Sequence, residues 1–62
     1  MDSQSIIQYL GLNVRLTLIN NFWYRAKVIS VSRDSVVFVE EKGRKLTVTP
    51  DSITMIEEIM TK

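Results

Sequence analysis

The sequence predicts a mainly β fold, in which a short N-terminal helix precedes five short antiparallel strands of a strongly bent sheet. Apolar and polar residues alternate along both halves of the stretch 14–28, and two three-residue turns each end on a residue that tolerates a left-handed backbone. Five strands in 62 residues leave room only for tight turns, so we expect the sheet to close into a small barrel. We assign one domain to residues 1–62, with the helix at about 3–10 and the barrel at about 12–58.

The helix is expected within the first ten residues. Asp2 or Ser3 can cap its N-terminus, and Gly11 is a natural stop. A helix of about two turns is not stable alone, so its apolar stripe must lie on the sheet. That stripe consists of Ile6, Ile7 and Leu10.

The stretch 14–28 (VRLTLINNFWYRAKV) is expected to form a hairpin around Asn20 and Asn21. A two-residue loop would mix polar and apolar faces, whereas a three-residue loop of residues 19–21, with Asn21 left-handed, keeps the apolar face intact. We therefore predict the three-residue loop. It pairs Leu18 with Phe22, Leu16 with Tyr24 and Val14 with Ala26, so that Phe22 and Tyr24 face the core.

The same register predicts the outward face of the hairpin. Thr17 stands opposite Trp23, Arg15 stands opposite Arg25, and Lys27 follows one step along. Like charges facing each other across strands cost on the order of 0.2–1 kcal/mol. An exposed tryptophan beside such a pair indicates an anionic partner with stackable rings, although long basic side chains that splay into water explain the pattern equally well.

The rest of the chain follows the same rules. Apolar positions shift at residues 29–30, which indicates a bend or bulge in the second strand, and residues 32–35 form a turn by composition. Residues 36–40 (VVFVE) are apolar enough for burial on both faces. A loop of residues 41–43 pairs Glu40 with Arg44, Phe38 with Leu46 and Val36 with Val48. Residues 50–52 are expected to form one helical turn and residues 53–57 the last strand.

The composition predicts an assembly of several copies. A chain this short buries only about 60% of its unfolded surface, so its core is marginal. The absence of cysteine and histidine excludes disulfides and thiolate or imidazole metal sites as stabilisers. Oligomerisation is the remaining means of stabilisation, and a content of 45% hydrophobic residues fits a protomer with an apolar interface. No apolar run approaches a membrane span and the start lacks a signal pattern, so we expect a cytoplasmic protein with no membrane partner.

Charge and residue types point away from catalysis. There is no acid between residues 3 and 33, which carry four bases, so the first half of the chain can present a positive face. The usual general base and thiol nucleophile are missing, and the two glycines form no phosphate loop. The acidic pairs Glu40-Glu41 and Glu57-Glu58 are expected to be solvated strand ends. We expect no enzyme, no catalytic residue, no metal and no cofactor.

The order of one short helix and five bent strands resembles the Sm-like proteins, including the bacterial Hfq branch, whose barrel is SH3-like. The similarity is densest at VRLTLINNFWYRAKV, which resembles the first Sm motif, with Asn21 at the turn glycine and Ala26 at the small residue before the long bent strand. The closing ITMI of residues 53–56 is similar to the end of the second motif. The resemblance covers about residues 6–59.

The resemblance implies a ring of five to seven copies, in which the last strand of each copy pairs with the fourth strand of its neighbour. It also implies single-stranded RNA bound on a ring face or in the pore. In Hfq-type rings the first hairpin contacts adenine-rich RNA, and the corresponding positions here are Thr17, Asn21, Phe22, Trp23, Tyr24 and Arg25. Together with the outward face, our candidate RNA-binding residues are Arg15, Thr17, Asn21, Trp23, Arg25 and Lys27.

A second candidate site departs from the family pattern. The uridine pocket of the family needs a base before the last strand, Arg-Gly in Sm proteins and Lys-His in Hfq, where this chain has Pro50-Asp51. The acidic turn before the third strand survives only as residues 33–35. The vestigial nucleotide pocket would thus comprise Arg33, Asp34, Ser35, Pro50 and Asp51.

Two function hypotheses follow from these features. The first is a non-enzymatic Sm-like ring that binds single-stranded RNA through Trp23 and the basic residues of the hairpin. The alternative is a structural or protein-interaction ring of the same fold without RNA binding. The one-sided basic hairpin favours the first hypothesis, whereas the net charge of only +1 and the missing second-motif base favour the alternative.

Overall fold

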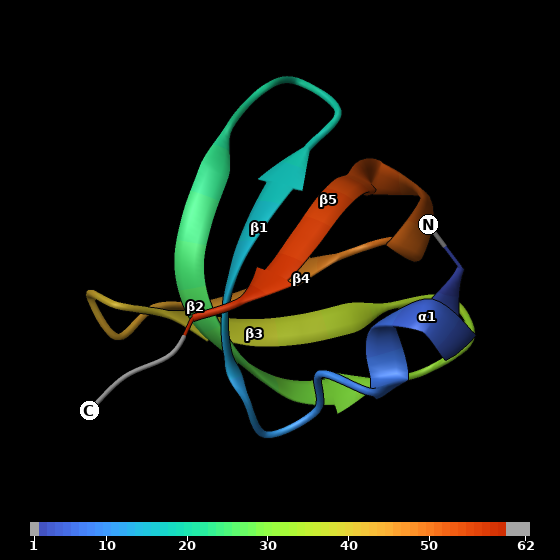
Figure 1. The fold of residues 1–62 in the computed structure, drawn as a ribbon, viewed down its shortest axis with the longest axis horizontal. Helices are drawn as coiled ribbons and strands as arrows, with labels where there is room; N and C mark the ends of the chain where they lie inside the picture. The colour runs from blue at the N-terminus through green and yellow to red at the C-terminus, as the bar shows by residue number, and fades with distance from the viewer. Residues whose placement is uncertain (1, 60–62) are drawn as a thin grey trace.

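A computed structural model describes residues 2–59, so the predicted domain limits at residues 1 and 62 lie outside the described part. The order of elements is the predicted one (Figure 1). The elements are helix α1 (Ser3–Ile7), strands β1 (Asn13–Leu18), β2 (Trp23–Val31), β3 (Val36–Glu40) and β4 (Lys45–Val48), the 3₁₀ turn η1 (Pro50–Ser52) and strand β5 (Ile53–Glu58).

The five strands form one antiparallel sheet in the order β4-β3-β2-β1-β5. Figure 1 shows β3 crossing beneath the β1–β2 hairpin, so the sheet is strongly bent. The expected closure into a barrel is wrong for the single chain, because β4 and β5 remain the two edges among the described residues. The turn η1 explains this order: the Ile19 N–H donates to the Ser52 carbonyl at 2.9 Å, which delivers β5 to the free side of β1.

The first hairpin has the predicted register. Leu16 pairs with Tyr24 and Arg15 with Arg25, and the Leu18 N–H donates to the Phe22 carbonyl at 2.7 Å. Asn21 has a φ of 70°, which confirms the left-handed loop residue. The apolar pattern alone therefore sufficed to select this loop, because a shift by one residue would have turned every side chain to the other face.

The left-handed Asn21 gives a prediction on stability. Asn21→Gly is expected to be neutral or mildly stabilising, whereas Asn21→Val should cost about 1–2 kcal/mol, because a β-branched side chain is strained at positive φ. Urea unfolding, monitored by circular dichroism, measures the free energy of unfolding of both variants. Equal effects of the two substitutions would contradict the strain argument.

The second hairpin also follows the prediction, with Phe38 paired to Leu46 and the Glu40 N–H bonded to the Arg44 carbonyl at 2.9 Å. Gly43 closes its loop with a φ of 95°. The register between β2 and β3 shifts between Val28 and Ser30, which confirms the expected bulge. The bulge lets β2 belong to both halves of the bent sheet.

A second irregularity, which the sequence pattern did not predict, lies where β5 meets β1. Leu18 pairs with Ile53 and Thr17 with Met55, so Thr54 is an extra residue on β5. Its hydroxyl donates to the Thr17 carbonyl at 3.2 Å. The extra residue puts both Ile53 and Ile56 in the core although they are three positions apart, and β5 extends to Glu58, one residue beyond the prediction.

The core lies on the concave side of the sheet and is closed at one end by α1 (Figure 1). Phe38 is fully buried, and its ring lies 5.7 Å from that of Tyr24. The expected core position of Phe22 is wrong: its side chain is 61% exposed, because it stands at the hairpin tip beyond the end of the packed interior. The buried apolar residues are Ile6, Val14, Leu16, Ala26, Val28, Val36, Phe38, Ile53 and Ile56.

Helix α1 is shorter than the predicted 3–10. Asp2 caps it by accepting a hydrogen bond from the Ser5 N–H at 2.9 Å, and hydrogen bonds from Ser5 lower the pKa of the Asp2 carboxyl. After residue 7 the chain turns with bonds between residues three apart, and the Gly11 N–H donates to the Val28 carbonyl on β2. This anchor leaves only Ile6 of the predicted stripe buried, while Ile7 and Leu10 are exposed.

The prediction that β3 is buried on both faces holds for only one of them. Val36 and Phe38 are buried on the core side, whereas Val37 and Val39 on the other side are only half-buried. No element of the described chain covers that second face fully, because α1 closes the core side instead.

Candidate functional site

The outward side chains of the first hairpin form one surface, which we call the basic hairpin face. Its members are Arg15 and Thr17 on β1 and Trp23, Arg25 and Lys27 on β2, as the alternation of the strands predicts. Trp23 is 55% exposed, and Thr17 is half-buried between its strand neighbours. Asn21, the sixth predicted residue, lies in the loop at the end of the same hairpin, so the structure brings all six together.

Arg15 is the most constrained cation of the basic hairpin face. Its guanidinium carbon lies 5.1 Å from the centre of the Trp23 ring, and its Nε lies 4.0 Å from Oε1 of Glu57, the residue that pairs with it on β5. Both contacts lie away from Arg25 directly opposite, because Glu57 is across the sheet on β5 and Trp23 is in the next row toward the hairpin loop. They explain how the chain tolerates the like-charged Arg15–Arg25 pair.

Arg25 and Lys27 are the available cations. Within residues 2–59 neither side chain makes a hydrogen bond or an ion pair, and both are exposed. Backbone pairing fixes their strand: Lys27 pairs with Asn13 on β1 and Val39 on β3, and the Arg25 carbonyl accepts from the Glu41 N–H at 3.0 Å. An anion would meet two adaptable positive side chains on a well-paired backbone.

Shallow depressions surround these side chains. One of about 280 Å³ is lined by Trp23 and its sequence neighbours 21, 22 and 24. A second of about 180 Å³ runs from Trp23 and Arg25 to Glu41 and Lys42 in the β3–β4 loop. The largest, of about 450 Å³, continues from Arg25 past Lys27. Its lining residues are Asn13, Arg25, Ala26, Lys27, Val39, Glu40, Glu41 and Ile59.

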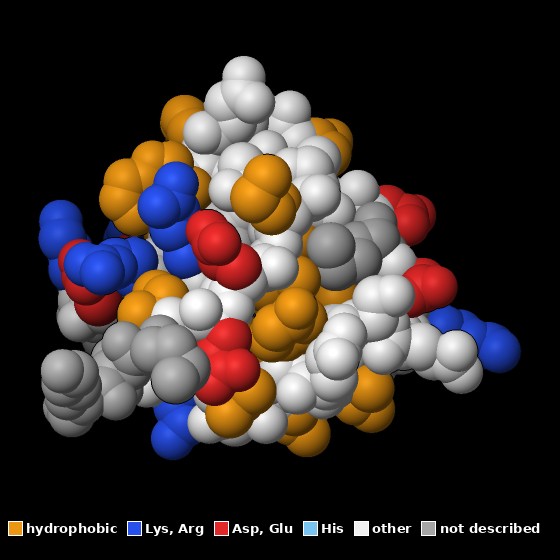
Figure 2. All heavy atoms as spheres, in the orientation of Figure 1, with side chains coloured by type: hydrophobic (Ala, Val, Ile, Leu, Met, Phe, Trp, Pro, Cys, Tyr) orange, Lys and Arg blue, Asp and Glu red, His pale blue; other side chains and the backbone are white. Residues whose placement is uncertain are grey.

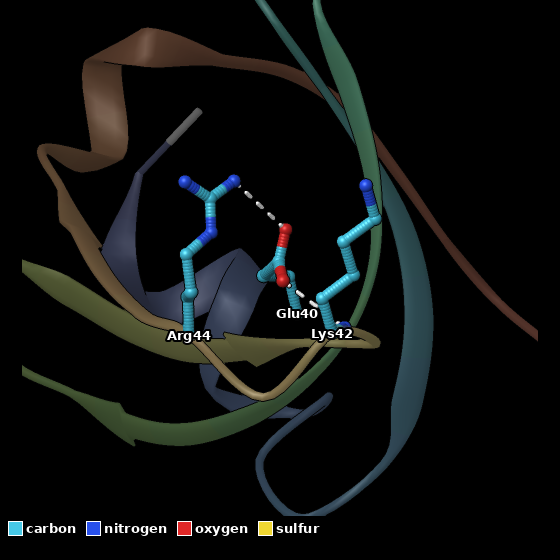
Figure 3. Close-up of polar contacts among 3 residues, drawn as sticks. All are labelled: Glu40, Lys42 and Arg44. Carbon is cyan, nitrogen blue, oxygen red and sulfur yellow. Dashed lines mark hydrogen bonds and ion pairs between the residues drawn. The ribbon is translucent and has the colours of Figure 1, made fainter.

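Glu40 is not the solvated acid that the sequence suggested. Its side chain is only 7% exposed, because it projects to the core side opposite the small Ala26. Its carboxylate accepts from Nη2 of Arg44 at 3.2 Å and from the Lys42 N–H at 3.0 Å (Figure 3). The hydrogen bond from Arg44 holds the pKa of the Glu40 carboxyl below its usual value. The charge of Glu40 is thus paired with Arg44, and it shapes the loop that presents Lys42.

Apolar side chains are exposed at the same end of the molecule. Ile19 and Phe22 lie at the tip of the first hairpin, and Met55 on β5 pairs with Thr17 beside them. Figure 2 shows Lys and Arg side chains gathered mainly at the left of the view, with apolar atoms between them. The surface therefore offers apolar contacts as well as positive charge.

The second predicted site is also brought together. Arg33, Asp34, Pro50 and Asp51 line a depression of about 400 Å³, together with Asp2, Ser3 and Thr49. Ser35 does not line it, because its hydroxyl bonds to that of Ser32 at 2.9 Å within the turn. Three acids around one arginine make this depression a poor place for a phosphate.

Sequence reasoning placed Glu57 among solvated acids and gave no role to Lys42. The position of Glu57 beside Arg15 depends on the β1–β5 register, which in turn depends on the unpredicted bulge at Thr54. Lys42 lines the same depression as Trp23 because the Glu41 N–H of the β3–β4 loop donates to the Arg25 carbonyl. The expected bulge at residues 28–30 could have been used to predict the register between β2 and β3. That register would have placed Lys42 near Trp23.

Comparison with protein-family models, with curated proteins and with solved structures finds no match for this chain. Among residues 2–59 no helix has the length and apolar character needed to cross a membrane. The described acidic side chains form no group that could hold a metal ion.

Proposed function

We propose that this protein is a non-enzymatic, Sm-like ring protein that binds single-stranded RNA on the basic hairpin face. The observation that supports this most is the exposed Trp23 ring beside Arg25 and Lys27, two cations without a partner among the described side chains. A base stacks on an aromatic ring whatever its identity, and the two cations neutralise the phosphates on either side. A cytoplasmic location is part of the proposal.

Ring formation is supported by the two edges of the sheet. Strand β4 and residues 54–58 of β5 each have a strand neighbour on one side only. Pairing β4 of one copy with β5 of the next would extend the sheet around a closed ring and leave no edge exposed. A cyclic assembly of five to seven copies would also bring several basic hairpin faces onto one surface, where an RNA strand can contact more than one.

The alternative is a structural or protein-interaction ring without RNA binding. The acidic character of the depression around Arg33 favours it, because Asp34 and Asp51 would repel a phosphate there. The exposed Ile19, Phe22 and Met55 also favour it, since apolar patches are typical of protein interfaces.

The test of RNA binding uses two substitutions on the basic hairpin face. Trp23→Ala should weaken binding of a poly-A oligonucleotide by about 1–3 kcal/mol per stacked base, and Trp23→Phe should retain most of the affinity. Arg25→Ala should weaken binding and reduce the slope of log K against log salt by about 0.7 for each phosphate that the protein no longer neutralises. Fluorescence anisotropy of labelled poly-A and poly-U at several salt concentrations gives both quantities.

Arg33→Ala is the matched control for poly-A binding, because it removes the same charge from the second depression and not from the basic hairpin face. Sedimentation of each variant checks that assembly is unchanged. If Trp23→Ala and Arg25→Ala bind every oligonucleotide as the parent protein does, the RNA proposal fails and the protein-interaction ring replaces it. Asp51→Lys tests the second depression: a gain in poly-U binding means that its charge alone disables it.

A further inference from the structure

We infer that Glu57 limits the nucleic-acid affinity of the basic hairpin face, because it pairs with Arg15 beside Trp23 and competes with phosphate for the Arg15 guanidinium. This inference rests on the proposed function, and it assigns Glu57 a positioning role in that same site. The residues come from three strands, β1, β2 and β5, which the sheet order places side by side.

The geometry supplies the first step. Arg15 lies between Arg25 on one side and Glu57 on the other, in the same row of the sheet. Its Nε lies 4.0 Å from Oε1 of Glu57, and its guanidinium carbon lies 5.1 Å from the centre of the Trp23 ring. Repulsion from Arg25 on β2 and attraction to Glu57 on β5 act in the same direction across the sheet, so both favour the contact of Arg15 with Glu57.

The second step concerns the indole of Trp23. Arg15 covers one side of the ring, whereas the two depressions that Trp23 lines include neither Arg15 nor Glu57. A base stacked on the side that faces these depressions would lie near Arg25 and Lys42, which line one of them together with Trp23. In this arrangement Arg15 polarises the ring but is withheld from the phosphate.

The third step concerns the strength of the Arg15–Glu57 ion pair. Both partners of the Arg15–Glu57 pair are more than half exposed, at 53% and 58%, so the pair is weak and phosphate can break it. An exposed pair of this kind typically contributes on the order of 0.2–1 kcal/mol, which corresponds to a change in affinity of about 1.4- to 5-fold. Removing the Glu57 charge should therefore release Arg15 to bind one additional phosphate.

The experiment compares Glu57→Gln with Glu58→Gln, its neighbour on β5, which is also exposed and carries the same charge. We expect Glu57→Gln to bind a poly-A oligonucleotide about 1.4- to 5-fold more tightly than Glu58→Gln, with a salt slope steeper by about 0.7. In an Arg15→Gln background the two variants should bind equally, since Glu57 acts only through Arg15. The inference is overturned if Glu57→Gln and Glu58→Gln have equal affinities and equal salt slopes when Arg15 is present. It is also overturned if Glu57→Gln still binds more tightly in the Arg15→Gln background.

A measurement without RNA separates this inference from the proposed function. Trp23 is the only tryptophan in the chain, so its emission reports directly on the guanidinium above it. Glu57→Gln should change the emission of the free protein and Glu58→Gln should not. If the parent binds no oligonucleotide, the proposed function fails. If the emission of Glu57→Gln matches that of the parent, the positioning role fails.

Discussion

Ile53→Asp is expected to unfold the protein and to prevent its assembly. Ile53 is 1% exposed and lies at the start of β5, where it packs in the core and pairs with Leu18. A carboxylate at this position loses the apolar burial and has to be desolvated, which costs at least about 4 kcal/mol. A domain of this size has a free energy of unfolding near the lower end of about 5–15 kcal/mol, so the variant retains little stability. Circular dichroism and sedimentation velocity measure folding and assembly together.

Met55→Asp is the matched control, because it introduces the same carboxylate two residues further along β5, on the exposed face. We expect it to stay folded, because its side chain lies outside the core, and its sedimentation then reports on the proposed contact between β5 and a neighbouring copy alone. A folded monomer of the parent at micromolar concentration would contradict the ring. A folded Ile53→Asp would show that β5 contributes little to the core.

Phe38→Ala is expected to have the next largest effect, a loss of about 3–5 kcal/mol. The ring of Phe38 is fully buried in the middle of β3 and packs against Tyr24, so its removal leaves a cavity that the short strands cannot fill. Phe22→Ala provides a direct comparison. It deletes the same ring at an exposed site and should change the free energy of unfolding by no more than about 0.5 kcal/mol.

Thermal and urea unfolding of the two variants measures this difference. Both are measured at equal protein concentration, because the proposed assembly would make the apparent stability depend on concentration. A comparable loss in both variants would mean that Phe22 is covered in solution. In that case the apolar hairpin tip would be part of an interface between copies or with another protein.

The hairpins could be predicted from sequence because local constraints determine them. In the first, alternation on both sides of Asn21 admits only one register that keeps the apolar side chains together, and the structure has that register. In the second, Gly43 and the pairing of Glu40 with Arg44 agree on the same kind of loop. The outward residues of the basic hairpin face follow from the first register, whereas the members of the second candidate site were predicted only from the family resemblance.

The features that escaped prediction depend on contacts between distant parts of the chain. Alternation within β3 puts Glu40 on the same face as Val36 and Phe38, but its burial depends on β2, which brings the small Ala26 opposite it. Helix α1 ends early because Gly11 bonds to Val28. Phe22 has the inward alternation of a core residue but lies beyond the end of the core, and alternation reports which way a side chain points without reporting whether anything covers it.

The strand order has a consequence for how the chain folds. Strands β1 to β4 pair with their sequence neighbours, whereas β5 must find β1 across the three strands between them. Closing that long loop costs entropy before any contact repays it, so the local hairpins can form early and the docking of β5 completes the fold. Until β5 has paired with β1, the backbone N–H and C=O groups on that side of β1 are unpaired and can bind a strand of another chain. A chain of this topology is therefore most exposed to aggregation in the interval before its last strand is in place.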